Sequence, residues 1–309
     1  MNSAKPTLQW QQHHGEVLSN ANGFDVIECN TCGFKHVVPL PTTDELIKVY
    51  QHDYYDQEKP LYLTRYKQDL PWWNGVYEHR YHVFTQYLAP TQRTILDIGS
   101  GPGYFLLKGK TLGWNTFGIE PSEQAALHSK QLGLNIFNGF FDKDTANIFG
   151  AVDAINLSLV LEHIPDPTAL LQLVYQQLNP NGLLCVIVPN DFNPFQQILS
   201  QHTGLPEWWV APPHHLNYFN FRSLTALLSR CGFDVVHEET TFPIDLFLLM
   251  GDNYIGNDEL GRTCHSKRMQ FEQNLIASGN HQLLSDLYSS LAKHGIGREV
   301  VLYARKNSY

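Results

Sequence analysis

The 309-residue chain has no long hydrophobic run. No stretch approaches the roughly 18 consecutive apolar residues that a membrane-crossing helix needs. Residues 1–20 are polar and rich in histidine and glutamine, without the basic-then-apolar layout of a signal peptide. We therefore expect a soluble, cytoplasmic protein without a membrane partner.

The chain also lacks a cluster of basic residues. Its 21 Lys and Arg are outnumbered by 30 Asp and Glu, and the net charge of -9 comes from acids dispersed along the sequence. Nucleic-acid binding relies on a basic surface that neutralises phosphates, so we expect no nucleic-acid partner. The composition favours a small-molecule partner and leaves the oligomeric state open.

Cysteines are few, odd in number and scattered. Of the five, only Cys29 and Cys32 lie close together in the sequence, so reduced thiols are expected instead of a disulfide framework. With 43% hydrophobic and 17% charged residues, a chain of this length buries a large core. A disordered or fibrous protein is excluded.

Apolar segments alternate with amphipathic segments from residue 94 onward, which predicts a doubly wound α/β fold with a parallel sheet covered on both faces. Strands are expected at 94–98, 115–120, 134–137, 152–159, 183–188, 233–238 and 299–304. Helices are expected at 104–112, 122–132, 167–178 and 221–231. Residues 240–298 form an insertion before the last strand, with further helices at 259–278 and 281–294.

A glycine-rich turn follows the first of these strands. Gly99, Gly101 and Gly103 are spaced G-x-G-x-G, and Asp97 precedes them. Dinucleotide-binding loops are spaced G-x-G-x-x-G, which would require the third glycine at position 104, and they place a pyrophosphate on the helix N-terminus. A carboxylate beside the loop disfavours a diphosphate. It favours a ligand with a cationic end, such as an ammonium near a sulfonium.

Two further acids follow the next strands. Glu120 ends the second strand, where a carboxylate can accept hydrogen bonds from both hydroxyls of a ribose, a role that suits NAD equally well. Asp142 follows the weak third strand and either accepts from an adenine amino group, with Phe140 or Phe141 packed on the ring, or caps a local turn.

Four ordered segments carry a resemblance to a known family. They are LDIGSGPG at 96–103, GIEPS at 118–122, LVLEHIPDP at 159–167 and LNPNG at 178–182, followed by HLNYF at 215–219. Together they resemble class I S-adenosylmethionine-dependent methyltransferases of the branch that includes ubiquinone-type and sugar methyltransferases. The resemblance covers residues 94–188 and 214–233.

The resemblance implies a Rossmann-like, seven-stranded, mostly parallel sheet whose last strand runs antiparallel beside the fifth. We expect an N-terminal cap at 1–71 and a methyltransferase domain at 72–309, with the cofactor core at 90–190, an acceptor-side segment at 191–231 and the helical insertion at 240–298. The implied cofactor is S-adenosylmethionine. Its expected contacts are Asp97, Gly99, Ser100, Gly101, Gly103 and Tyr104 at the methionine end, Glu120 and Pro121 at the ribose, Asp142 at the adenine, and Leu157 from the fourth strand.

Methyl transfer is an in-line displacement that depends mainly on alignment, and a general base helps only a protonated nucleophile. His163 and His215 are the preferred candidates for such a base, with Asp191 and Tyr218 as weaker ones. All lie near the predicted carboxyl edge of the sheet. Two tryptophan pairs, 72–73 and 208–209, are expected either to wall off the site or to pack on the core.

Cys29 and Cys32 resemble half of a zinc ribbon in the front end of several sugar-modifying methyltransferases, which carry a second cysteine pair upstream. Here the upstream position holds His13 and His14, and His36 follows. A Cys-x-x-Cys pair with two histidines could complete a tetrahedral zinc site. Because the upstream thiols are missing, the sequence favours a metal-free knuckle.

We therefore expect a methyltransferase that acts on a small molecule such as a sugar, a quinone precursor or a secondary metabolite. One alternative is a catalytically inactive cofactor-binding or interaction module on the same fold. A second is an NAD-dependent dehydrogenase, which the glycine spacing disfavours.

Overall fold

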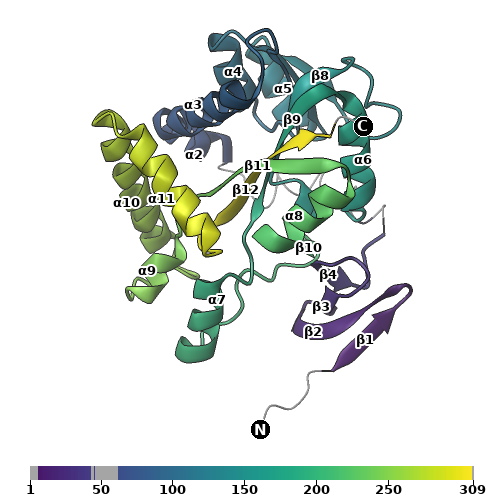
Figure 1. Ribbon diagram of the computed structural model, residues 1–309. Coiled ribbons are helices and arrows are strands. Elements are labelled where there is room, and N and C mark those ends of the chain that lie inside the picture. Colours follow the sequence, from purple (N-terminus) through teal and green to yellow (C-terminus); the bar gives the residue numbers. More distant parts are fainter. Residues whose placement is uncertain (1–5, 43–44, 46–61, 308–309) are drawn as a thin grey trace.

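The computed structural model describes residues 6–42, 45 and 62–307. These residues form a seven-stranded sheet, which carries helices on both faces, and a smaller five-stranded sheet. Figure 1 shows the smaller sheet at one side of the molecule and the helices of the insertion at the other. Among the described residues, no helix combines the length and the apolar character that crossing a membrane requires.

The large sheet confirms the predicted topology. Its order is β11 (Phe233–Thr240), β12 (Glu299–Lys306), β9 (Leu178–Pro189), β8 (Val152–Ser158), β5 (Thr94–Ile98), β6 (Asn115–Glu120) and β7 (Asn135–Asn138). The strands from β9 to β7 pair in parallel. As expected, β12 runs antiparallel to β9, and β11 pairs antiparallel with β12.

Four helices connect these strands close to the expected bounds: α4 (Tyr104–Thr111), α5 (Glu123–Gln131), α6 (Pro167–Gln177) and α8 (Phe221–Arg230). Side-chain caps explain three of their starts. Ser122 accepts from the backbone N–H of Ala125, Asp166 accepts from that of Ala169, and Asn220 forms a capping box with Ser223.

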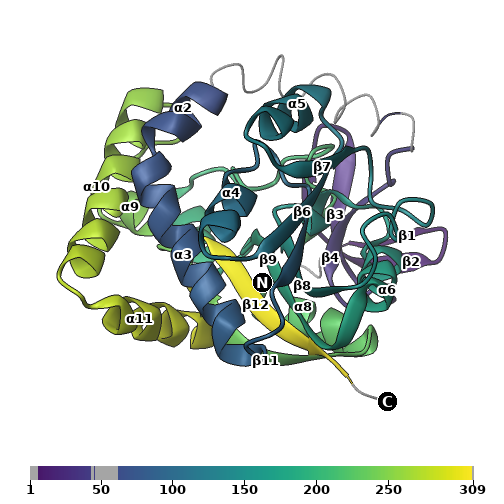
Figure 2. The same cartoon turned by 90° about the horizontal axis from the view of Figure 1, so that it is seen from above.

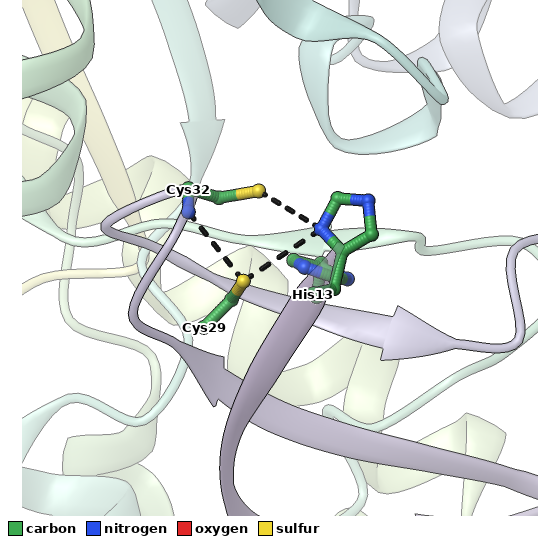
Figure 3. A group of neighbouring side chains, drawn as sticks. His13, Cys29 and Cys32 are labelled. Carbon is green, nitrogen blue, oxygen red and sulfur yellow. Dashed lines mark hydrogen bonds between the residues drawn. The ribbon is translucent and has the colours of Figure 1, made fainter. Parts of the chain in front are cut away.

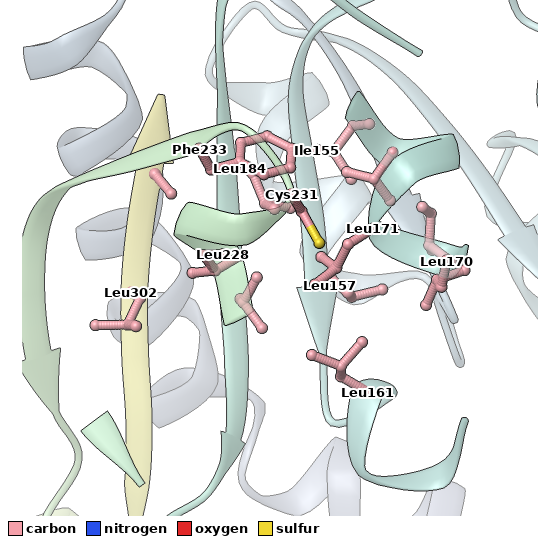
Figure 4. Packing of buried hydrophobic residues seen from close by; sticks show 14 of the residues in the cluster. Ile155, Leu157, Leu161, Leu170, Leu171, Leu184, Leu228, Cys231, Phe233 and Leu302 are labelled. Atoms are coloured by element: carbon pink, nitrogen blue, oxygen red, sulfur yellow. The ribbon is translucent and has the colours of Figure 1, made fainter. Parts of the chain in front are cut away.

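The core consists of two main layers, one on each face of the large sheet. Leucines of α6 and α8 pack against β8, β9 and β12 on one face, as Figure 4 shows for Leu170, Leu228 and Leu302. Aromatic side chains form much of the other layer, where Tyr77 and Tyr81 lie against Phe105 of α4.

The second layer depends on a helix that the sequence analysis did not predict. After the short helix α2 (Tyr62–Gln68), α3 (Leu70–Tyr87) crosses the sheet and buries Trp72, Tyr77 and Tyr81. Figure 2 shows α3 between the sheet and the insertion. The insertion contains α9 (Asp245–Leu249), α10 (Asp258–Ala277) and α11 (His281–Lys293), which confirms the two helices expected there.

The small sheet joins segments that are far apart in the sequence. Its strands are β1 (Thr7–Trp10), β2 (His13–Ala21), β3 (Phe24–Cys29), β4 (Lys35–Val38) and β10 (Asn217–Tyr218), all antiparallel to their neighbours. Because β10 comes from the predicted acceptor-side segment, the N-terminal region is bonded directly to it. The remaining short helices are η2 (Leu161–His163), α7 (Pro194–Ile198) and η3 (Leu199–Thr203).

Candidate active site

The glycine loop follows β5 and lies tightly against its neighbours. Gly99 and Gly103 have φ values of 73° and 81°, in the left-handed region that side chains rarely adopt. A Cβ at Gly99 would lie 2.6 Å from Cγ2 of Val160, and one at Gly103 would lie 2.5 Å from Oγ of Ser129. The loop therefore requires glycine at both positions for its backbone conformation and for the close approach.

Asp97 is buried beside this loop. Its Oδ1 accepts a hydrogen bond of 2.6 Å from the amide nitrogen of Asn156. The Oδ1 of Asn156 in turn accepts from Nη1 of Arg80 at 3.2 Å. Burial raises the pKa of Asp97 to about 7, although Asn156 and Arg80 favour the charged form. A buried carboxyl group that is held in a fixed position and has a raised pKa is typical of a binding site.

The sequence analysis missed Arg80 because it did not predict α3. The apolar residues at 77, 81 and 84 have helical spacing and could have indicated the helix. Nothing in that pattern indicates that the arginine between them reaches the end of β5.

Glu120 lies at the end of β6, as expected, and its two carboxylate oxygens are held by backbone donors. Oε2 accepts from the N–H of Gly101 at 2.7 Å, and Oε1 accepts from the N–H of Ser122 at 2.8 Å. Burial raises the pKa of Glu120 to about 7, against the opposing effect of these hydrogen bonds. The carboxylate is thus fixed between the glycine loop and the start of α5.

Three other predicted contacts surround these acids. Ser100 is buried, and its Oγ has no hydrogen-bond partner among the described residues. Tyr104 is the first residue of α4, and its ring stacks on that of Tyr66 with centroids 5.3 Å apart. Pro121 lies in the bend directly after Glu120. All three are therefore near the carboxyl ends of β5 and β6.

Two predicted contacts are placed differently. Asp142 is exposed, and its Oδ1 accepts from the backbone N–H groups of Asp144 and Thr145, which is the turn-capping alternative. The Leu157 side chain is fully buried in the core layer under α6 (Figure 4). Contacts of these two residues with a cofactor stay predictions.

His163 and His215 come together although they are 52 positions apart in the sequence. Their ring centroids are 5.2 Å apart, and one ligand atom from each lies within 4.8 Å of a carboxylate oxygen of Glu162. Nδ1 of His163 is 2.6 Å from the backbone oxygen of His214, a distance at which this nitrogen donates. Nε2 of His163 then carries the lone pair, 3.6 Å from Oε1 of Glu162.

The weaker candidates border this pair. Asp191 is buried, with Oδ2 3.9 Å from Nδ1 of His215 and Oδ1 3.6 Å from Nη1 of Arg298. Burial raises the pKa of Asp191 to about 6. The hydroxyl of Tyr218 accepts from the N–H of Ala211 and donates to the backbone oxygen of His215, each at 3.2 Å. Tyr218 therefore supports the backbone that carries His215.

A partly open cavity lies between α3, the insertion helices and the ends of β9, β11 and β12. Its lining includes Trp72, Trp73, Arg80, Ile187, Glu239 and Tyr288. The first tryptophan pair therefore borders a cavity, which is one of the two arrangements considered for it. The second pair does not line it: Trp209 packs edge-on against Phe192 with centroids 5.6 Å apart.

Glu272 of α10 connects the walls of the cavity by hydrogen bonds. Its carboxylate accepts from Nε1 of Trp72 on α3 and from the hydroxyl of Tyr288 on α11. The insertion is thus bonded to α3 through a buried acid, and it forms one wall of the cavity.

Cys29 and Cys32 lie in the small sheet, apart from the residues above. Cys29 ends β3, and Cys32 lies in the turn before β4. His13 and His36 are beside them, whereas the side chain of His14 is exposed.

Comparisons with known proteins agree with this arrangement. A family model described as "Methyltransferase domain" matches residues 73–238, more than half of the chain. The ubiquinone biosynthesis O-methyltransferase of Histophilus somni is 35% identical over 104 residues, which are 30% of this chain and 44% of that protein. The enzyme of the same name from Cronobacter sakazakii is 31% identical over 96 residues, 29% of this chain and 40% of that protein. The chain thus spans less than half the length of these relatives.

Two solved structures share the fold. The plantazolicin methyltransferase solved in complex with SAH has a TM-score of 0.51 at 17% identity, covering 85% of this chain and 94% of the other. Magnesium protoporphyrin IX methyltransferase from Synechocystis PCC 6803, with bound SAH, has a TM-score of 0.51 at 12% identity, covering 86% and 100%. With the family match over the sheet and the glycine loop, these findings show that the chain belongs to the class I methyltransferase family.

Proposed function

We propose that the protein transfers a methyl group from S-adenosylmethionine to a hydroxyl group of a small-molecule acceptor. The observation that carries the proposal is the pair of buried carboxylates, Asp97 and Glu120, on either side of the glycine loop. Burial raises the pKa of both to about 7, so their charged forms are costly without a ligand. A ligand with a cationic end and two neighbouring hydroxyls offsets that cost.

The residues present fit this cofactor. Asp97 would hold the ammonium of the methionine end, and Glu120, fixed by two backbone donors, would accept from the ribose hydroxyls. The buried Oγ of Ser100 supplies a further hydrogen-bonding group beside the loop. When bound, the cofactor supplies an activated methyl group on a sulfonium.

The cavity beside α3 is the proposed acceptor site. Arg80 lines it and is connected through Asn156 to Asp97, so the cavity adjoins the proposed methionine end. Indole rings of Trp72 and Trp73 give it flat apolar walls, which suit a planar or largely apolar acceptor. The similarity to ubiquinone biosynthesis O-methyltransferases supports a hydroxyl of a quinone precursor over the other acceptors considered.

His163 and His215 are the proposed bases for that hydroxyl, and they approach it from outside the set of residues that line the cavity. The turn η2, which carries His163, packs on the glycine loop through Val160. Oε1 of Glu162 lies 3.6 Å from Nε2 of His163, and burial raises the pKa of this acid well above its ordinary value, which disfavours its charged form. The proton taken from the acceptor would reside on a histidine nitrogen at this edge of the sheet.

Parallel calorimetric titrations with S-adenosylmethionine, S-adenosylhomocysteine and NAD test the proposed cofactor. We expect both sulfur compounds to bind and NAD to give no heat. Binding of NAD alone would overturn the proposal in favour of a dehydrogenase.

An acceptor screen then tests turnover. Catechols, other phenols, sugars and hydroxylated secondary metabolites are incubated with the cofactor, and products are detected by the added mass of a methyl group and by release of S-adenosylhomocysteine. Methylated phenols are expected. Methylation only of sugars or amines would remove the hydroxyl assignment, and cofactor binding without any product across the screen would favour the inactive module.

A further inference from the structure

A second group of side chains, all of types that can bind a metal ion, lies in the small sheet, outside the proposed methyl-transfer site. His13 begins β2, Cys29 ends β3, Cys32 lies in the following turn and His36 lies on β4. One ligand atom from each of the four lies within 4.8 Å of all the others. Four soft or borderline ligands from three strands and a turn therefore converge on one point.

The distances between these atoms match those around a tetrahedral zinc ion. Nδ1 of His13 is 3.3 Å from Sγ of Cys32 and 3.7 Å from Sγ of Cys29, as Figure 3 shows. With Zn–S bonds of about 2.3 Å and Zn–N bonds of about 2.0 Å, neighbouring ligands around a tetrahedral ion are about 3.5 Å apart. The imidazole nitrogen is therefore already at the separation from each sulfur that coordination requires.

His36 supplies an independent indication of a ligand. It is 2% exposed, and its Nδ1 lies 2.9 Å from the backbone oxygen of Val37, to which it donates. Its Nε2 is buried without a hydrogen-bond partner among the described residues and belongs to the four-residue group. An unpaired buried nitrogen is costly, whereas a histidine held at Nδ1 by a carbonyl presents Nε2 to a metal.

The turn that carries the cysteines has the form of a metal-binding knuckle. The N–H of Cys32 points to Sγ of Cys29 at 3.4 Å, and the N–H of Gly33 donates to the oxygen of Cys29 at 2.9 Å. Gly33 has a φ of 75°, which suits glycine. An N–H directed at a sulfur stabilises the thiolate form, which is the form that binds zinc.

We propose that His13, Cys29, Cys32 and His36 form a structural zinc site. Two thiolates and two neutral imidazoles balance the charge of Zn²⁺, so the occupied site is neutral, as a buried site should be. All four positions are filled by protein, which leaves none for water or substrate and excludes a catalytic role for the ion. The sequence favoured a metal-free knuckle because a second cysteine pair is missing; the fold places two histidines there.

The site connects to the methyltransferase domain at two points. Arg230, at the end of α8, donates from Nη2 to the backbone oxygen of Cys32 at 2.7 Å. His36 pairs with Asn217 of β10, in the segment that contains His215. Zinc would therefore hold the small sheet and, through it, the backbone segment that carries His215, one of the proposed bases.

The experiment is metal analysis of the full-length protein purified without chelator or added metal. We expect about one zinc per chain, and X-ray absorption at the zinc edge should show two sulfur and two nitrogen ligands at about 2.3 and 2.0 Å. After zinc is exchanged for cobalt, thiolate-to-metal charge-transfer bands and intense tetrahedral bands should appear. Zinc far below stoichiometry, together with no tetrahedral cobalt spectrum, would overturn the proposal.

Variants separate this site from zinc bound elsewhere. Cys32→Ser and His36→Gln should each lower the zinc content at least about fivefold, whereas His14→Gln, which changes the exposed neighbour of His13, should keep it. Unchanged zinc in Cys32→Ser would show that the ion is bound elsewhere. If a ligand variant does not fold, the cobalt spectrum of the unmodified protein decides the matter. None of these readouts depends on methyl transfer, so the zinc site and the proposed function can fail separately.

Discussion

His36 on β4 and Asn217 on β10 are directly paired residues of one sheet, although 181 positions separate them (217 − 36). The side-chain amide of Asn217 continues the connection, because Nδ2 donates to the backbone oxygens of Leu161 at 3.0 Å and Ile164 at 2.7 Å. The N-terminal sheet is thereby joined to the turn that carries His163. A change in the small sheet can therefore reach the turn that carries His163 through Asn217.

Asn217→Ala tests this connection between the small sheet and the turn that carries His163. The variant leaves two backbone oxygens without their donor in a buried region, which should cost about 1–3 kcal/mol of unfolding free energy. Urea denaturation measures the loss, and Asn147→Ala, at an exposed position, should change stability by less than about 0.5 kcal/mol. Equal stability of the two variants would show that the hydrogen bonds of Asn217 contribute nothing to the unfolding free energy.

Asp97→Asn tests the methionine end. Asparagine keeps an oxygen that can accept from Asn156 but removes the charge, so a cationic ligand loses its counter-ion in a buried site. Calorimetry should show S-adenosylmethionine affinity lowered about 100-fold. The ligand-free variant should be at least as stable as the parent at pH 8, because the native carboxylate is ionised there at a cost. Unchanged affinity would remove Asp97 from the site.

Cofactor binding should depend on pH through both acids. Burial raises the pKa of Asp97 and of Glu120 to about 7, so the folded protein holds these protons more tightly than the unfolded chain. Without ligand, their contribution to stability is therefore largest at low pH and decreases as pH rises from about 4 to 7. Binding of a cationic cofactor should strengthen from pH 6 to pH 8, measured by calorimetry in buffers of matched ionic strength. In Asp97→Asn the pH dependence should be weaker, and affinity that falls over this range would contradict the model.

The sequence predicted the large sheet well because apolar segments alternate there with amphipathic ones and the central strands are followed by turn signals. Gly99 and Glu120 could be placed for the same reason: each follows a strand end, and the carboxyl ends of parallel strands meet at one edge. The small sheet was not predicted, and its pairing of His36 with Asn217 joins positions so far apart that no local pattern encodes the contact.

Sequence reasoning indicated candidate residues at strand ends and the tryptophan pair at 72–73. It missed Arg80, which reaches the site from α3, and Glu272, which reaches it from the insertion. Their roles depend on how helices pack on the sheet, which periodicity does not specify. His36 illustrates the same point: its value as a ligand comes from a register in β4 that brings it beside Cys29.

Gly103→Ala should destabilise the glycine loop by about 1–3 kcal/mol. The position combines a φ of 81° with a Cβ location 2.5 Å from Oγ of Ser129 and 2.7 Å from Cδ1 of Leu134. Gly113→Ala is a matched control, because Gly113 has a φ of 84° but nothing within 4 Å of its Cβ position. The difference between the two losses of unfolding free energy, measured by urea denaturation, gives the contribution of the close contacts at the Cβ position of residue 103. If the control loses as much, the loop is constrained only by its backbone conformation.

His215→Ala distinguishes a base from a residue that merely shapes the acceptor side. If His215 takes the proton of the acceptor, the variant should lower kcat by about 10²–10⁴ while the dissociation constant of S-adenosylmethionine stays unchanged. Oδ2 of Asp191 is 3.9 Å from Nδ1 of His215. A substitution of Asp191 should therefore lower kcat less, because this residue acts on the reaction only through the histidine. His202→Ala changes an exposed histidine of η3 and should leave both quantities unaltered. Steady-state kinetics with the acceptor from the screen, combined with calorimetry, provide the two numbers. Undiminished turnover in His215→Ala would leave His163 as the remaining candidate, and the same result in His163→Ala would indicate that alignment of the acceptor suffices without a base.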